Sequence, residues 1–219
     1  MNETRKDLGK NILLVVLGLV PLAFGIYLTI RANIGASPWD ALALGLAGTF
    51  GISYGTGNIL IGLTVVGLDL LLREPIGAGT LLNAILLGKF VDFFDWLDLV
   101  PAQQSLLTGV PMMLAGWVLV GFSQYLYMKP ALGCGPRDSL MVALGRRVRR
   151  VPIGMISLLI LLAAALGGWL LGGPIGVGTV LSVLAAGPIM QAEFRMVGFD
   201  ATGLQHQDIA DSLRVLGRR

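Results

Sequence analysis

The chain has 219 residues, of which 55 % are hydrophobic and only 13 % are charged. Soluble domains carry about 25 % charged residues, so this chain has too few charges to cover a water-facing surface of its own. Its net charge of +3 comes from arginines at the ends of apolar segments, which indicates membrane topology rather than a nucleic-acid surface. A single cysteine, Cys134, excludes an intrachain disulfide.

Six apolar segments are long enough to span a bilayer, and two more are about half that length. A spanning helix needs about 20 residues, and the long segments are residues 11–31, 56–72, 78–98, 106–128, 153–171 and 177–195. Lipid leaves no partner for free backbone groups, and these runs lack the alternation of barrel strands, so we expect an all-α polytopic membrane bundle. The short segments, 38–50 and 136–145, favour half-helices. Tilted spanning, which would give eight spans, stays open.

The sequence also repeats itself. The segment GASPWDAL (35–42) is matched by GCGPRDSL (133–140) at an offset of 98 residues. PIGAGT (75–80) is matched by PIGVGT (174–179) at an offset of 99 residues. Two motifs in the same order at nearly the same offset indicate an internal duplication.

Charge bias predicts that the two repeats are inverted in the bilayer. The loop after the first half-helix, residues 51–55, has no cation, whereas its counterpart carries four arginines between 146 and 150. With six spans, fourteen of the sixteen Lys and Arg residues lie inside, against eleven with eight spans. We therefore expect a cytoplasmic N-terminus (1–10), repeat one (11–98), a loop (99–105), repeat two (106–197) and a cytoplasmic tail (198–219).

The repeated half-helices each carry an aspartate at the third helical position, Asp40 and Asp138, after Pro38 and Pro136. Two interpretations stay open. The aspartates can finish the helix starts as capping residues. Alternatively, if the half-helices begin near the bilayer midplane, two buried carboxylates would face each other beside free N–H groups and could take protons or bind a cation.

A second polar pattern follows the Gly-x-Gly-Thr turns. Thr80 and Asn83 lie three residues apart on one helix face, and Thr179 and Ser182 repeat that spacing. These side chains either hydrogen-bond to neighbouring helices or form a polar stripe along a substrate path.

Charged residues interrupt the third long segment. Lys89 and Asp92 are adjacent on a helix surface, and pairing would make them far less costly in lipid. The matched positions, Pro188 and Gln191, are uncharged, so the two halves differ chemically. The pair is therefore a further candidate for substrate or ion binding.

Several of these motifs resemble the YczE/YitT family of bacterial integral membrane proteins. They are the repeated Gly-x-x-Pro-x-Asp-x-Leu, the turn GISYGTG (51–57), and GAGTLLN (77–83) followed by Gly88 and Asp92. The resemblance covers about residues 10–195 and is to the short, YczE-like branch. It implies a multi-pass protein of the bacterial cytoplasmic membrane, with a role in small-molecule export or in regulating secondary-metabolite production. Asp40, Asp138, Asn83 and Asp92 match its polar positions.

Two functions remain in view. The first is a small-molecule secondary transporter or exporter with a polar site at the repeat interface. The second is a non-transporting adaptor that regulates a biosynthetic enzyme complex through its arginine cluster. No nucleophile motif, phosphate loop or Cys/His metal pattern occurs, so we expect no enzyme activity, cofactor or metal. Expected partners are the lipid bilayer, a small-molecule or ion substrate and, in a homodimer, a second copy.

Overall fold

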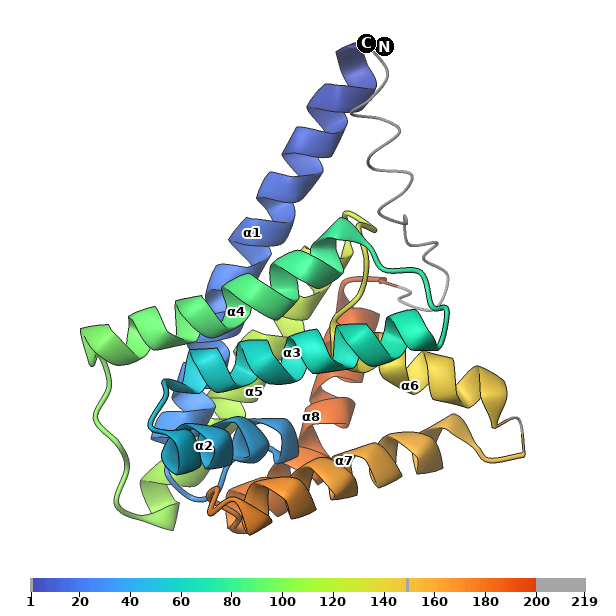
Figure 1. Cartoon of the computed structure of the whole chain (residues 1–219). Helices are drawn as coiled ribbons and strands as arrows, with labels where there is room; N and C mark the ends of the chain where they lie inside the picture. The colour runs from blue at the N-terminus through green and yellow to red at the C-terminus, as the bar shows by residue number, and fades with distance from the viewer. Residues whose placement is uncertain (1, 149, 200–219) are drawn as a thin grey trace.

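The computed structural model describes residues 2–148 and 150–199, and the regular structure in this part of the chain is α-helical (Figure 1). The helices are α1 (Asn2–Arg31), α2 (Pro38–Phe50), α3 (Tyr54–Leu71), α4 (Ala78–Leu97), α5 (Leu106–Met128), α6 (Pro136–Arg147), α7 (Ile153–Leu170) and α8 (Val177–Met196). The predicted all-helical class is confirmed. Residues 200–219, most of the predicted tail, lie outside the described part.

The predicted long and short segments correspond to these helices one by one, and most ends agree within two residues. The exception is α1, which begins at Asn2 instead of residue 11. Residues 2–10 include Glu, Arg, Lys and Leu, which are good helix formers, so the helix continues beyond the apolar run.

Four described helices are long and apolar enough to cross a membrane: Leu8–Arg31, Tyr54–Leu71, Leu106–Met128 and Val177–Met196. Helix α7 is apolar but slightly shorter, and α4 carries Lys89, Asp92 and Asp95. These helices support a membrane bundle, and the count of six spans stays a prediction.

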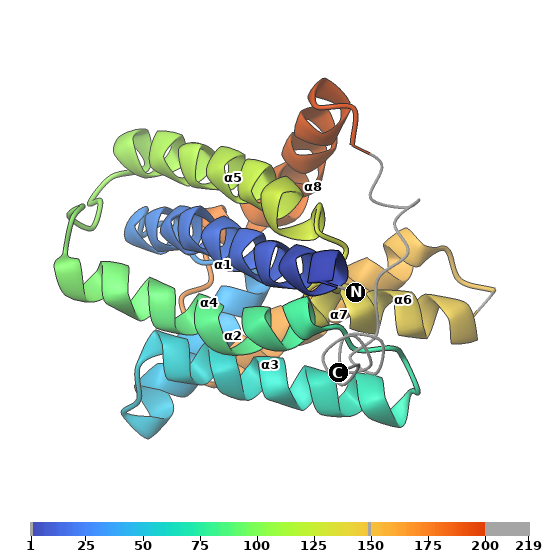
Figure 2. The same cartoon turned by 90° about the horizontal axis from the view of Figure 1, so that it is seen from above.

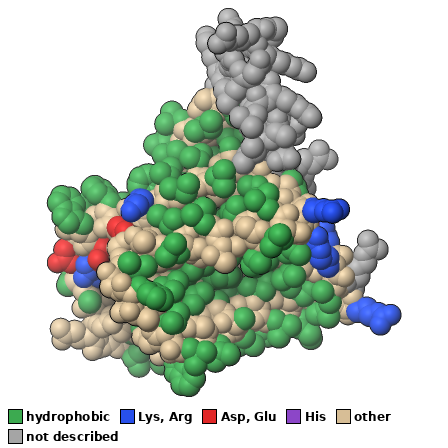
Figure 3. All heavy atoms as spheres, viewed as in Figure 1, with side chains coloured by type: hydrophobic (Ala, Val, Ile, Leu, Met, Phe, Trp, Pro, Cys, Tyr) green, Lys and Arg blue, Asp and Glu red, His purple; other side chains and the backbone are tan. Residues whose placement is uncertain are grey.

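Charged side chains gather at two opposite edges of the face shown in Figure 3, with hydrophobic side chains between them. At one end of the bundle, Arg31 forms ion pairs with Asp95 and Asp98. At the other end, Arg146 and Arg147 lie beside Glu74. Two charged rims around an apolar band are typical of a protein that crosses a bilayer.

The two halves of the chain interlock. Helix α1 packs along α5 and α4, and α5 packs along α8. The half-helix α2 packs on α7, and the half-helix α6 packs on α3, so each short helix rests on a long helix from the other half. In Figure 1, α2 runs from the centre towards one charged edge and α6 runs towards the opposite edge, while α3 and α7 also run in opposite directions. Figure 2 shows α1 and α5 side by side from above. Opposite directions of matched helices agree with the predicted inversion, which stays a prediction.

Candidate substrate-binding cavity

The turns before the two half-helices are held by threonines from the opposite half of the chain. Thr80 Oγ1 donates a hydrogen bond of 2.7 Å to the carbonyl of Cys134, just before α6. Thr179 Oγ1 donates a bond of the same length to the carbonyl of Ala36, just before α2. Both threonines are buried and neither lines the cavity described below. These bonds agree with the interpretation that the threonines hydrogen-bond to neighbouring parts of the chain, and a place along a substrate path stays a prediction.

The backbone repeats this crossed arrangement. The N–H of Gly79 donates to the carbonyl of Leu132, and the N–H of Gly178 donates to the carbonyl of Ile34, both at 2.8 Å. The turns pass so close to each other that a Cβ at Gly35 would lie 2.6 Å from the nitrogen of Gly176, and Gly35 has a φ of 108°. Glycine at position 35 has no Cβ to collide with Gly176, and it adopts this positive φ without strain.

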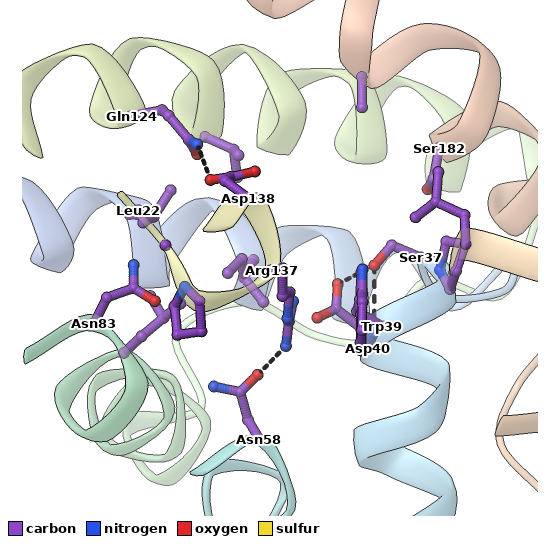
Figure 4. Close-up of a pocket in the computed structure, with 18 of the residues that line it drawn as sticks. Leu22, Ser37, Trp39, Asp40, Asn58, Asn83, Gln124, Arg137, Asp138 and Ser182 are labelled. Atoms are coloured by element: carbon purple, nitrogen blue, oxygen red, sulfur yellow. Dashed lines mark hydrogen bonds between the residues drawn. The ribbon is translucent and has the colours of Figure 1, made fainter. Parts of the chain in front are cut away.

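A cavity of about 340 Å³ lies where the two half-helices begin, and side chains of the surrounding long helices also line it. Four of the eight predicted site residues line it: Asp40, Asp138, Asn83 and Ser182. The two aspartates therefore line one cavity, from the starts of α2 and α6 (Figure 4). The Ser182 hydroxyl donates a hydrogen bond of 2.7 Å to the carbonyl of Gly178, so its proton is already bound within α8.

Asp40 is fully engaged by its neighbours. Its side chain is 3 % exposed, and its two oxygens accept hydrogen bonds from Ser37 Oγ at 2.5 Å and from Tyr54 OH at 2.8 Å. Ser37 Oγ also accepts from the backbone N–H of Asp40, which is the cap at the start of α2. Asp40 therefore stabilises the junction of α2 and α3.

Asp138 is in a different position. In the described part of the chain, its one side-chain donor is Gln124 Nε2, at 3.3 Å. The two hydroxyl donors of Asp40 have no counterpart here, because the matched positions are Gly135 and Ile153. The helix start of α6 also has no side-chain cap in the described structure. Asp138 is thus the less engaged of the two carboxylates, and it faces the cavity.

Arg137 stands at the position that matches Trp39 and brings a cation into the cavity. Its Nη2 donates to Asn58 Oδ1 at 2.5 Å, and its guanidinium carbon lies 5.0 Å from the centre of the Trp39 ring. Among the described residues it forms no ion pair, even with Asp138 next to it in sequence. The guanidinium therefore keeps hydrogen-bonding capacity for a ligand.

Two buried polar groups in the cavity wall lack a partner within the described structure: the Tyr127 hydroxyl and the Trp117 ring nitrogen. Tyr127 is only 1 % exposed. An unsatisfied buried donor costs about 1–3 kcal/mol, so these two groups are uncompensated polar groups in the cavity wall.

The predicted pair of Lys89 and Asp92 is not formed. Asp92 accepts hydrogen bonds from Ser53 Oγ at 2.6 Å and from the N–H of Gly55 at 2.7 Å, while Lys89 is exposed. The start of α3 offers Asp92 a hydroxyl and a free backbone N–H, which favour a carboxylate there. Neither Lys89 nor Asp92 lines the cavity.

Sequence reasoning missed much of the polar lining, namely Arg137, Gln124, Asn58, Trp117 and Tyr127. A signal existed for two of them, because Gln124 and Asn58 are polar residues inside apolar spans, where polar groups are expensive. Nothing in the sequence distinguished Arg137 from the other arginines of the second half, because its place at the cavity depends on where α6 begins.

Comparison with known proteins agrees with the resemblance seen in the motifs. The profile of DUF6198, a family of unknown function, matches residues 9–193. The uncharacterized membrane protein YczE of Bacillus subtilis (strain 168) is 41 % identical over 180 residues, which are 80 % of each chain. An uncharacterized protein of Haemophilus influenzae (strain ATCC 51907 / DSM 11121 / KW20 / Rd) is 32 % identical over 182 residues, 83 % of this chain and 82 % of that protein. No solved structure matches significantly. The chain therefore belongs to the YczE-like family of membrane proteins that the DUF6198 profile describes.

Proposed function

We propose that this protein is a secondary transporter or exporter of small molecules in the bacterial cytoplasmic membrane. The observation that carries the proposal is that both half-helices begin at one cavity that holds two carboxylates and a guanidinium, in a bundle whose face in Figure 3 is largely apolar between its charged edges. Interrupted helices whose ends meet at a central site are typical of transporters built from inverted repeats.

The crossed contacts support the same proposal. Each turn before a half-helix is bound by the opposite half, so the cavity lies at the interface between two similar units. In transporters of this kind, substrate and coupling-ion sites lie at the repeat interface, and motion of one unit against the other exposes the site alternately to each side.

The cavity residues have distinct roles in this proposal. Asp138 is the group that takes up a proton or cation, because it faces the cavity with few partners. Arg137 and Asn58 bind polar groups of the substrate. Asp40 keeps the α2–α3 junction in shape and does not exchange ligands, since both of its oxygens are occupied.

The adaptor alternative relied on the arginine cluster as a docking surface. Arg146 Nη1 lies 3.1 Å from a Glu74 carboxylate oxygen, and Arg147 donates to the carbonyl of Leu72. Two of the arginines thus connect α6 to the end of α3 within the chain. This internal use of the cluster favours the transporter over the adaptor.

Metabolite distribution tests the proposal whatever the substrate is. Cells that produce the wild type and cells that produce Asp138→Asn at equal levels would be compared by untargeted mass spectrometry of medium and cell extract. We expect at least one small molecule whose ratio between medium and cell changes with the wild type and not with Asp138→Asn. Asp98→Asn, at an exposed helix end, is the control and should behave as the wild type. If no molecule changes its distribution, the proposal is wrong.

A further inference from the structure

The two matched helix pairs α3–α4 and α7–α8 pack very differently. In the first pair, a Cβ at Gly88 would lie 2.5 Å from the carbonyl oxygen of Gly55, so the backbones are in contact. The matched glycines of the second pair are Gly154 and Gly187, and nothing described lies within 4 Å of either Cβ position. Helix α3 packs along α4, whereas α7 and α8 have almost no contact in the described structure.

The space that this separation leaves is continuous with the central cavity. A second cavity of about 270 Å³ lies between α5, α6, α7 and α8, and it shares Trp117, Arg137 and Asp138 with the first. Its wall on α7 and α8 is mainly apolar, with Ile160, Leu161, Ala186 and Met190 beside Ser157. The path therefore changes from charged at its inner end to apolar between α7 and α8.

The exposed surfaces of the two helices that flank the opening carry large apolar side chains. Large apolar side chains beside it on α7 and α8 are exposed, with Leu159 at 58 %, Leu162 at 56 % and Leu184 at 66 %. In a membrane bundle, exposed leucines on the long faces of helices are surrounded by acyl chains. A molecule in the bilayer can therefore reach the opening without crossing the water phase.

We propose that α7 and α8 form a side entrance through which a zwitterionic amphiphile moves between the bilayer and the cavity, which deepens and rests on the proposed transport function. The apolar part of the molecule lies between α7 and α8. Its anionic group binds the Arg137 guanidinium, and its cationic group binds the Asp138 carboxylate. These two side chains share the cavity without forming an ion pair with each other, so a head group with both charges satisfies both.

Gly154 and Gly187 allow the entrance to close. Their counterparts Gly55 and Gly88 show that a glycine at each position lets the two helix backbones touch. Closure of α7 on α8 in the same way would remove the second cavity and separate the bound molecule from the bilayer.

Tryptophan fluorescence tests the entrance. A variant that keeps only Trp117 (Trp39→Phe, Trp96→Phe and Trp169→Phe) would be reconstituted in phosphatidylcholine vesicles with brominated acyl chains. Trp117 is half-buried and lines both cavities, and we expect brominated lipid to reduce its emission at least twofold and aqueous acrylamide to have little effect. If acrylamide alone quenches Trp117, the entrance opens to water and the proposal is wrong. If neither quenches it, the opening is closed or covered by a second copy, which also contradicts the proposal.

A blocking substitution locates the path. Gly187→Phe places a large side chain in the opening and should remove most of the lipid quenching of Trp117. Gly67→Phe is the matched control, because it also has nothing described within 4 Å and lies on α3. Equal quenching in both variants would show that lipid reaches Trp117 by another route.

Probe molecules test the head group. Brominated lysophosphatidylcholine, a brominated fatty acid and a brominated alkyltrimethylammonium would be added to the Trp117 variant in unbrominated phosphatidylglycerol vesicles, whose lipid is not zwitterionic and does not compete for the proposed site. We expect the zwitterion to quench at about tenfold lower concentration, with the difference lost in Arg137→Gln and in Asp138→Asn; tenfold corresponds to about 1.4 kcal/mol. Equal potency of the three probes would overturn the head-group assignment. None of these measurements needs transport, so quenching without any metabolite shift in cells would contradict the proposed function and leave the entrance intact.

Discussion

Asp40 and Asp138 show how matched residues acquire different roles. Both follow a proline at the start of a half-helix, and both line one cavity. Asp40 accepts hydrogen bonds from two hydroxyl groups, whereas Asp138 accepts one from an amide. The partners decide the difference, because serine and tyrosine in the first half are replaced by glycine and isoleucine in the second.

Substitution by asparagine should separate these roles. Asp40→Asn weakens two hydrogen bonds to a charged acceptor, and each such bond contributes about 1.5–3 kcal/mol. We expect this variant to unfold in detergent several degrees below the wild type. Asp138→Asn should unfold at nearly the wild-type temperature and lose transport. A thermal-shift assay on both purified proteins checks the prediction, and equal destabilisation of the two would contradict it.

Asp69 is a buried carboxylate that the proposed mechanism does not use. It is 0 % exposed within α3, and neither of its side-chain oxygens has a hydrogen-bond partner in the described structure. Asp69→Asn removes the need either to bury a charge or to protonate it, so we expect about 1 kcal/mol of stabilisation, a rise of about 2–4 °C in unfolding temperature. Asp98→Asn, at an exposed helix end, serves as the control. A fall in unfolding temperature would mean that Asp69 has a partner that the structure does not show.

At the scale of secondary-structure elements, the two short helices depend on helices that are distant in sequence. Neither α2 nor α6 is long enough to be stable alone, because short helices gain most of their stability from packing. Helix α2 lies on α7 and α6 lies on α3, while threonine side chains bind the turns before them. The position of each half-helix is therefore set by the other half of the chain.

Removal of the threonine hydroxyls should loosen these turns. Thr80→Val or Thr179→Val keeps the side-chain volume and leaves a buried carbonyl without its partner, which should cost about 1–2 kcal/mol of stability. Thr80→Ser and Thr179→Ser retain the hydroxyl and should lose less. Unfolding temperatures of the four purified variants provide the measurement. If the valine and serine variants behave alike, the hydroxyl groups contribute nothing.

At the scale of the whole molecule, the orientation of the two halves can be tested at matched positions. Gly48 is exposed near the end of α2, and Arg146 is its exposed counterpart near the end of α6. In a Cys134→Ala background, Gly48→Cys should react with a membrane-impermeant maleimide in intact cells. Arg146→Cys should react only after the cells are opened. Labelling of both from the same side would exclude inverted halves.

The sequence was sufficient to predict the helices, and it offered a common site for Asp40 and Asp138 as one of two interpretations, beside helix capping. Hydrophobic length predicts helices in lipid because backbone groups have no other partners there. The repeated motifs at 35–42 and 133–140 indicated that the two half-helix starts are equivalent positions of the two halves. The environment of Asp92 could not be predicted, since its partners Ser53 and Gly55 become neighbours only when α3 packs on α4. The separation of α7 from α8 was equally hidden, because their glycines match those of a closely packed pair.

The crossed turns also have a consequence for how the protein is made. The first half is synthesised before the second, so the turn before α2 and α2 itself cannot form their contacts with Thr179 and α7 until those residues have been made. Residues 1–104 produced alone should therefore be degraded, and co-production of residues 105–219 from a separate gene should restore both fragments to the membrane. Immunoblots of membrane fractions would show this. A first fragment that is stable by itself would mean that the first half folds before the second half is made, and that the second half then packs onto it.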